Sequence, residues 1–169
     1  MSEVIKMSYS KTNEASSKLN ESNDCMVKAI SISMNIPYEE VHEELRIAGR
    51  KSRRGTFMNT ADTAMDILCR RYNKQYVQSS PRNLYSRLKG GPIIKGKISL
   101  KRISKVFPKG NFILFTGSHA SAMIDGHIDD WAEGRKKQVY RIWEIEERES
   151  NRAILKIYAA HSFTNKDFK

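Results

Sequence analysis

Residues 118–131 have the sequence SHASAMIDGHIDDW, which is the clearest structural signal in the chain. Residues suited to extended strands stand on both sides of the pair Asp125-Gly126. An Asp-Gly pair favours the two-residue type I′ turn that joins the strands of a β-hairpin. The stretch therefore predicts a hairpin whose two strands meet at this pair.

The predicted turn determines which side chains share a face of the hairpin. With two turn residues, residue 121 faces residue 130 across the strands, and side chains alternate between the two faces. His119, Ser121 and Asp130 then lie on one face, with the imidazole and the carboxylate as diagonal neighbours. Asp129 points to the opposite face. The alternative interpretation is an exposed histidine on an edge strand, beside an acidic turn.

Helical periodicity dominates the chain before the hairpin. Residues 25–35, CMVKAISISMN, follow the capping pair Asn23-Asp24, and residues 36–49 form a second amphipathic pattern. Further helices are expected over residues 61–73, 82–90 and 100–107. Besides the hairpin, strands are expected over residues 111–117, 139–145 and 153–160.

Helices first and antiparallel strands second are typical of an α+β fold. We expect N-terminal helices packed on a C-terminal antiparallel β-sheet, in one domain over residues 21–160. Residues 1–20 have no periodic pattern and predict a flexible N-terminal arm. Residues 161–169 predict a polar tail. A chain of 169 residues is long enough for one such domain with a sizeable core.

The composition indicates a basic protein without a membrane segment. Lys+Arg 30 against Asp+Glu 19 give a formal net charge of +11, which favours polyanionic partners. The sequence contains no run of about 18 apolar residues and no signal peptide, so we expect no membrane association. Two cysteines are too few for a disulfide framework, and the expected compartment is the cytoplasm. The spacing of Cys and His predicts no metal site, and we expect no cofactor.

Cys25 stands where the first predicted helix begins. A thiol attacks carbonyl groups as the thiolate, and a free thiol with a pKa of about 8.5 is mostly protonated at neutral pH. The positive end of a helix dipole and a neighbouring imidazolium both lower that pKa. Cys25 and His119 could therefore form a thiolate–imidazolium pair. The alternative is a structural thiol buried in the helix, which is how we interpret Cys69.

A basic loop follows the second predicted helix and contains Arg50, Lys51, Arg53 and Arg54. Such a cluster is a candidate site for a polyanion, either an acidic host protein or a nucleic acid. Ordinary solvated surface charge is the alternative interpretation.

Three stretches of the chain together resemble the papain-like cysteine peptidases. They are NDCMVKAISISMNIPYEEVHEELRIAGR, RRGT and GSHASAMIDGHIDDW. They are most similar to small bacteriophage-encoded proteins related to bacteriocin-processing peptidases. The resemblance implies a papain-like fold, a protein or peptide substrate, and a place in the host cytoplasm. It also implies Cys25 as nucleophile, His119 as general base and acid, and Asp130 as the group that orients the imidazole.

One position departs from the pattern of this family. Papain-like peptidases carry a glutamine about six residues before the cysteine, where it donates to the oxyanion, but Leu19 stands there. Asn20 and Asn23 are the candidate amide donors in its place. Two functions stay open. One is a thiol hydrolase or acyl-transfer enzyme acting on a peptide, isopeptide or amide carbonyl. The other is an inactive binding protein of the same fold whose basic surface engages a host factor or nucleic acid.

Overall fold

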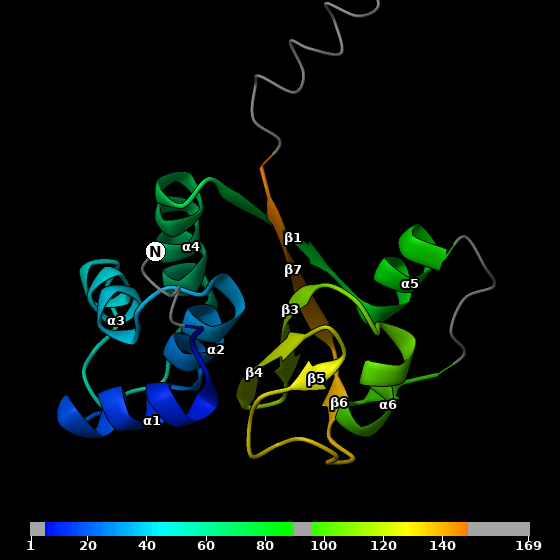
Figure 1. The fold of residues 1–169 in the computed structure, drawn as a ribbon, viewed down its shortest axis with the longest axis horizontal. Helices are drawn as coiled ribbons and strands as arrows, with labels where there is room; N and C mark the ends of the chain where they lie inside the picture. Colours follow the sequence, from blue (N-terminus) through cyan, green and yellow to red (C-terminus); the bar gives the residue numbers. More distant parts are fainter. Residues whose placement is uncertain (1–5, 90–95, 149–169) are drawn as a thin grey trace, which may run out of the picture.

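The computed structural model describes residues 6–89 and 96–148 (Figure 1). The helices in these ranges are α1 (Tyr9–Lys18), α2 (Cys25–Met34), α3 (Tyr38–Ile47), α4 (Met58–Arg71), α5 (Pro81–Lys89) and α6 (Leu100–Val106). The strands are β1 (Lys74–Ser79), β2 (Ile98–Ser99), β3 (Asn111–Thr116), β4 (His119–Ile124), β5 (His127–Ile128), β6 (Gln138–Val139) and β7 (Arg141–Glu147).

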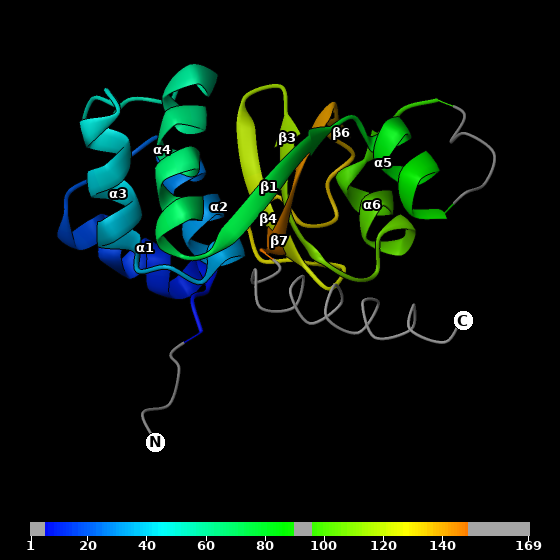
Figure 2. The same ribbon diagram turned by 90° about the horizontal axis from the view of Figure 1, so that it is seen from above.

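These elements form three layers, with a β-sheet between two groups of helices (Figure 2). The sheet is antiparallel and has the strand order β1-β7-β3-β4-β5. Helices α1 to α4 lie on one side of it, and α5 and α6 lie on the other. Strands β2 and β6 pair separately. The predicted α+β class and the antiparallel sheet are confirmed, while α5 and α6 form a helical layer on the far side of the sheet.

Two hydrophobic clusters, one on each face of the sheet, hold the layers together. The first joins α2, α3 and α4 to the sheet, and the second joins α5 and α6 to the opposite face. The central strands β3 and β7 are therefore buried on both faces along most of their length. This double burial explains the continuous apolar run in β3, which shows no alternation of polar and apolar residues.

Trp143 lies at the centre of the first cluster, fully buried between the rings of Tyr76 and Phe115 at centroid distances of 5.0 and 4.9 Å. Its Nε1–H has no hydrogen-bond partner among the described residues. A buried donor without a partner costs about 1–3 kcal/mol, so the indole ring is not the best occupant of this space.

Replacement of Trp143 by phenylalanine is therefore expected to lower the free energy of unfolding by less than about 1 kcal/mol, because the lost ring volume is offset by removal of the unpaired donor. Urea unfolding followed by circular dichroism would measure the difference. A loss of about 3 kcal/mol or more, as large-to-small substitutions in a core give, would contradict this interpretation.

The N-terminal segment is ordered where a flexible arm was expected, and that prediction is wrong for residues 9–18. Ser8 caps helix α1, with its hydroxyl accepting a hydrogen bond from the N–H of Lys11. Thr12, Ala15 and Ser16 are buried on the helix face that packs against α2 and α3. No hydrophobic pattern predicts this helix, because its buried residues are small and mostly polar.

The hairpin has the predicted register, since Ile124 pairs with His127 and Met123 with Ile128. The edge strand β1 and the short strands β2 and β6 were not predicted. Strand β1 is largely exposed, so the apolar alternation that signals a strand is weak there. The strand expected over 153–160 and the tail over 161–169 lie outside the described residues.

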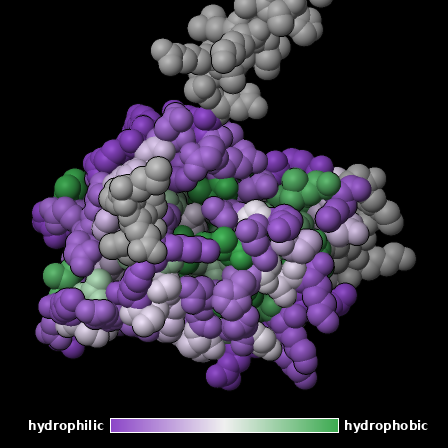
Figure 3. Space-filling model, viewed as in Figure 1, coloured by the Kyte–Doolittle hydropathy of each residue, from purple (hydrophilic) through white to green (hydrophobic). Residues whose placement is uncertain are grey.

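The face of the molecule shown in Figure 3 is largely hydrophilic, with hydrophobic residues in small separate patches. Within residues 6–89 and 96–148, each helix is too short or too polar to cross a lipid bilayer.

Candidate functional site

Cys25 is the first residue of helix α2, as the capping signal predicted, and α2 packs against strand β4. His119 is the first residue of that strand. The two residues, distant in sequence, line the same two cavities where the helix and the strand begin. The N–H groups at the start of a helix have no partners within the helix, so they are available around the sulfur.

Asp24 directly precedes Cys25 and binds residues of the helices around it. Its carboxylate is buried, accepts a hydrogen bond of 2.6 Å from the Tyr38 hydroxyl, and lies 3.1 Å from the Lys28 ammonium. Burial alone would raise the pKa of Asp24, but hydrogen bonds from Ser16, Tyr38 and Lys28 outweigh it and lower that pKa. The ionised side chain thus links α2 and α3 next to Cys25.

His119 and Asp130 form the contact that the hairpin register predicted. Nε2 of His119 lies 2.5 Å from Oδ2 of Asp130. The Ser121 hydroxyl donates to the same oxygen at 2.8 Å, and the N–H of Ala132 donates to Oδ1 at 3.4 Å. Asp129 lines one cavity together with His119 and Asp130, but its carboxylate accepts a hydrogen bond from the N–H of Tyr9 at 2.9 Å. Asp130 is therefore the carboxylate that contacts the imidazole.

The thiol and the imidazole change each other's protonation. Burial would raise the pKa of Cys25, but hydrogen bonds from His119 and from the N–H groups of Ala120 and Met26 outweigh it, so that pKa lies below its ordinary value. Burial would lower the pKa of His119, but its bonds to Asp130 and Cys25 raise it to about 9. At neutral pH these shifts favour the thiolate–imidazolium pair. Since Nε2 faces Asp130, Nδ1 is the nitrogen left for the thiol.

Trp131 covers the imidazole. Its ring centroid lies 4.8 Å from that of His119, with the two planes inclined at 49°. Only 11% of the His119 side chain is exposed, which limits competition from water for the bond to Asp130. The cationic groups of Arg135 and Lys137 lie 5.8 and 5.1 Å from the centroid of the Trp131 ring, on which they pack.

Two cavities open on either side of this thiol–imidazole–carboxylate cluster. The first has a volume of about 220 Å³ and is lined by Cys25, His119 and Asp130 together with Tyr9. The second, of about 210 Å³, is lined by Cys25, His119 and residues from the loop around Thr56. A substrate group can therefore reach the sulfur although most of the thiol is covered.

The two candidate oxyanion donors occupy different places. Asn23 lines the first cavity beside Cys25, in a left-handed conformation with φ of 54°. One N–H of its amide donates to the carbonyl of Arg53 at 3.2 Å, which leaves the other for a ligand. Asn20 is exposed in the turn after α1 and lines neither cavity. Leu19 is also exposed and lines neither of the two cavities, so it does not occupy the oxyanion position.

The basic loop divides into a buried part and an exposed part. The guanidinium of Arg50 is buried and lies 3.0 Å from the Glu21 carboxylate, so it supports the loop from within. Lys51, Arg53 and Arg54 are exposed. Glu21 also accepts hydrogen bonds from the Ser52 hydroxyl, from the N–H of Arg53 and from a ring nitrogen of His42. Only the exposed cations are placed to contact a polyanion.

The sequence interpretation missed the contributions of Asp24 and Tyr9. Asp24 was recognised only as a capping residue, yet its side chain makes no cap and binds Lys28 on α2 and Tyr38 on α3. Tyr9 lines the first cavity from a segment expected to be flexible. The one available signal was an ionisable residue directly before the candidate nucleophile.

Unlike Cys25, Cys69 is buried in α4 and forms no disulfide, and burial raises its pKa to about 11. The described residues contain no group of three or more His, Cys, Asp or Glu side chains placed to hold a metal ion.

Comparisons of the chain with family models, with curated proteins and with solved structures find no match.

Proposed function

We propose that this protein is a papain-like cysteine hydrolase or acyl-transfer enzyme that acts on a peptide, isopeptide or amide carbonyl. The observation that carries the proposal is the joint geometry of Cys25, His119 and Asp130. The thiol begins a helix, the imidazole begins the strand packed on it, and the carboxylate lies 2.5 Å from the imidazole. A helix that presents a thiol to a histidine on an antiparallel sheet supports the papain-like assignment.

The proposed reaction begins with attack of the Cys25 thiolate on the carbonyl carbon. His119 gives its proton to the leaving nitrogen, so the C–N bond breaks, an amine departs and a thioester forms. Water then attacks the thioester and gives a proton to His119, and the C–S bond breaks to release a carboxylic acid. The thiolate–imidazolium pair is restored. With an amine in place of water, the same second step is acyl transfer.

Two groups are placed to stabilise the oxyanion that forms in each step. The backbone N–H of Cys25 stands at the start of α2, where N–H groups have no partner within the helix. The free amide N–H of Asn23 lines the same cavity. Asp130 would hold the imidazole in the orientation that leaves Nδ1 toward sulfur, with Ser121 holding Asp130.

Thiol labelling tests the proposal and uses Cys69 as an internal control. At pH 6, Cys25 is expected to react with iodoacetamide at least about tenfold faster than Cys69, because the pKa of Cys25 is lowered whereas Cys69 is buried and its pKa is raised. Mass spectrometry of tryptic peptides would give both rates in the folded protein. Equal rates would rule out an activated thiol and would leave the inactive binding protein as the interpretation.

A further inference from the structure

Three adjoining hollows form one groove through the candidate site. The central hollow, of about 210 Å³, contains Cys25 and His119. It shares Gly55 and Thr56 with a hollow of about 450 Å³ beside the basic loop. On the other side it shares Ser118, among other residues, with a hollow of about 500 Å³. The groove therefore leads away from the sulfur in both directions.

The groove is positively charged at its two ends. Lys51 and Arg54 line one end, and Lys137 lines the other; all three are exposed. The described residues that line the three hollows include neither Asp nor Glu. Within the described part of the chain, none of these three cations belongs to an ion pair, whereas the charge of Arg50 is satisfied by Glu21.

The walls of the groove also carry groups that suit a polypeptide. Phe57 is 79% exposed at one end and Tyr140 is 52% exposed at the other, so each offers an aromatic surface to a bound segment.

We infer that this groove binds an extended, acidic segment of polypeptide, with carboxylate side chains on both sides of the carbonyl group that Cys25 attacks. The inference rests on the proposed function. The unpaired cations at both ends of the groove favour carboxylates on a bound segment at a distance from the sulfur, whereas Asp24, Asp129 and Asp130 line the adjoining cavity that would hold the attacked carbonyl. A thiolate at the centre favours a ligand with carbonyl carbons in its backbone, which distinguishes polypeptide from nucleic acid.

Protection of Cys25 from alkylation tests the inference. Two peptides of about twelve residues, long enough when extended to span the groove, would alternate alanine with either glutamate or glutamine. At low ionic strength the glutamate peptide is expected to slow iodoacetamide labelling of Cys25 about tenfold more than the glutamine peptide does. The difference should shrink at about 0.5 M salt, where the screening length falls to a few ångströms.

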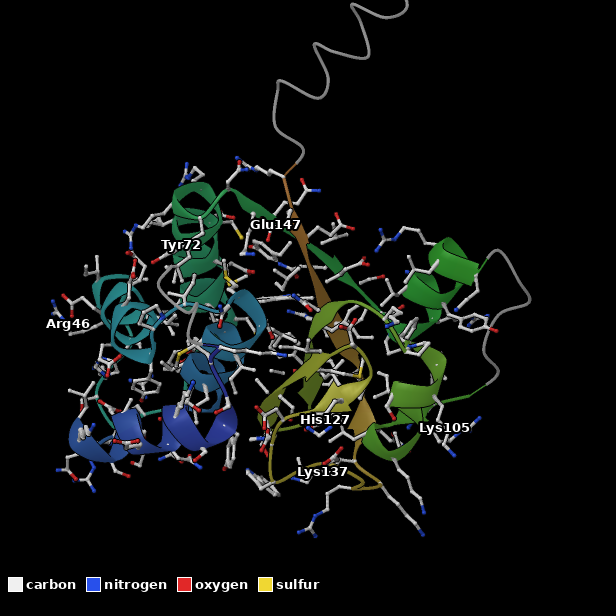
Figure 4. The ribbon with its side chains drawn as sticks, in the orientation of Figure 1. Arg46, Tyr72, Lys105, His127, Lys137 and Glu147 are labelled. Atoms are coloured by element: carbon white, nitrogen blue, oxygen red, sulfur yellow. The ribbon has the colours of Figure 1, made fainter. Side chains whose placement is uncertain are left out.

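Charge reversal at the two ends locates the binding. Lys51→Glu and Lys137→Glu are each expected to reduce protection by the glutamate peptide about threefold or more, as loss of a favourable charge contact and gain of a repulsive one predict. Lys105→Glu is the matched control, because Lys105 is exposed on α6 and lines none of the three hollows (Figure 4). It should leave protection nearly unchanged.

The outcomes separate this inference from the proposed function. Equal protection by the two peptides, or equal effects of all three charge reversals, would overturn the acidic-segment inference while rapid labelling of Cys25 still supported an enzyme. Stronger protection by an oligothymidylate of the same net charge would also overturn it and assign the groove to nucleic acid. Labelling of Cys25 no faster than Cys69 without any peptide would remove the proposed function itself.

Discussion

Replacement of His119 by alanine is expected to slow the alkylation of Cys25 at pH 6 by about 100-fold, because a thiol with an ordinary pKa near 8.5 is well under 1% ionised at that pH. The imidazole lowers the pKa of Cys25 by a hydrogen bond and by its charge, while burial acts in the opposite direction. Without His119 the effect of burial remains and the largest opposing contribution is gone. The pKa of the thiol should then rise toward or above its ordinary value.

The pH dependence of the labelling rate shows in which direction His119 shifts the pKa of Cys25. In the unsubstituted protein, the rate should rise with pH at values below those of a free thiol, since the pKa of Cys25 is lowered. In the His119→Ala variant the same rise should appear at higher pH. Any hydrolytic activity should fall again as the pH passes about 9, where His119 loses the proton needed by the leaving group.

His127 provides the matched control for this experiment. It lies in the same hairpin but outside the cluster, with 68% of its side chain exposed and Nδ1 3.3 Å from Glu133 (Figure 4). His127→Ala should leave the labelling rate of Cys25 within about twofold of the unsubstituted protein, because screened surface charges interact weakly. A comparable loss of reactivity in both variants would show that alanine perturbs the hairpin, not the charge state of the thiol.

Replacement of Glu21 by alanine is expected to lower the free energy of unfolding by about 3 kcal/mol at pH 7, because removal of one partner from a buried ion pair leaves the other charge uncompensated. The guanidinium of Arg50 is 1% exposed and lies 3.0 Å from the Glu21 carboxylate. The Ser52 hydroxyl and the N–H of Arg53 would also lose their acceptor. Urea unfolding would measure the change.

The same pair predicts a pH dependence of stability. Burial would raise the pKa of Glu21, but hydrogen bonds from His42, Arg53, Ser52 and Arg50 outweigh it and hold that pKa far below the ordinary value of 4.5. A carboxylate whose pKa is lowered by folding contributes stability above its unfolded pKa and loses it as the pH falls toward the folded value. The difference in free energy of unfolding between the unsubstituted protein and Glu21→Ala should therefore reach its maximum above about pH 5 and decrease below pH 4.5.

Glu43 is the control for Glu21. Its carboxylate binds Arg46, which Figure 4 labels on α3, at 2.7 Å, but both side chains are more than half exposed. Exposed ion pairs contribute about 0–1 kcal/mol, so Glu43→Ala should cost far less than Glu21→Ala. Equal losses in the two variants would show that burial of the Glu21–Arg50 pair does not determine the effect.

The local features of the candidate site were predictable from sequence. The pair Asp125-Gly126 specified a two-residue turn, and the alternation of strand side chains then selected Asp130 over Asp129 as the partner of His119. The capping signal before Cys25 placed the thiol at the start of α2. Each of these inferences depends on hydrogen bonds and turn geometry within a few residues, which neighbouring residue types specify directly.

Other parts of the site depended on contacts that no local pattern contains. The packing of α1 beside the cluster depends on small polar residues whose burial leaves little trace in the sequence. In the sequence the basic loop appeared to be one charged surface. In the structure Arg50 is buried and forms an ion pair with Glu21, although helices α2 and α3 separate the two residues along the chain. The amide beside the thiol belongs to Asn23, and neither Asn20 nor Leu19 lines the cavities.

The sequence by itself therefore determined the α+β class, the hairpin register, the helix that begins at Cys25 and the pairing of His119 with Asp130. Only the tertiary structure decided that α2 packs on β4 so that thiol and imidazole meet, which cations are exposed and where the groove runs. The physical reason is the distance along the chain between the residues that interact. Turns, caps and strand alternation are set by adjacent residues, whereas burial and charge pairing are set by surfaces that meet only when the whole chain packs.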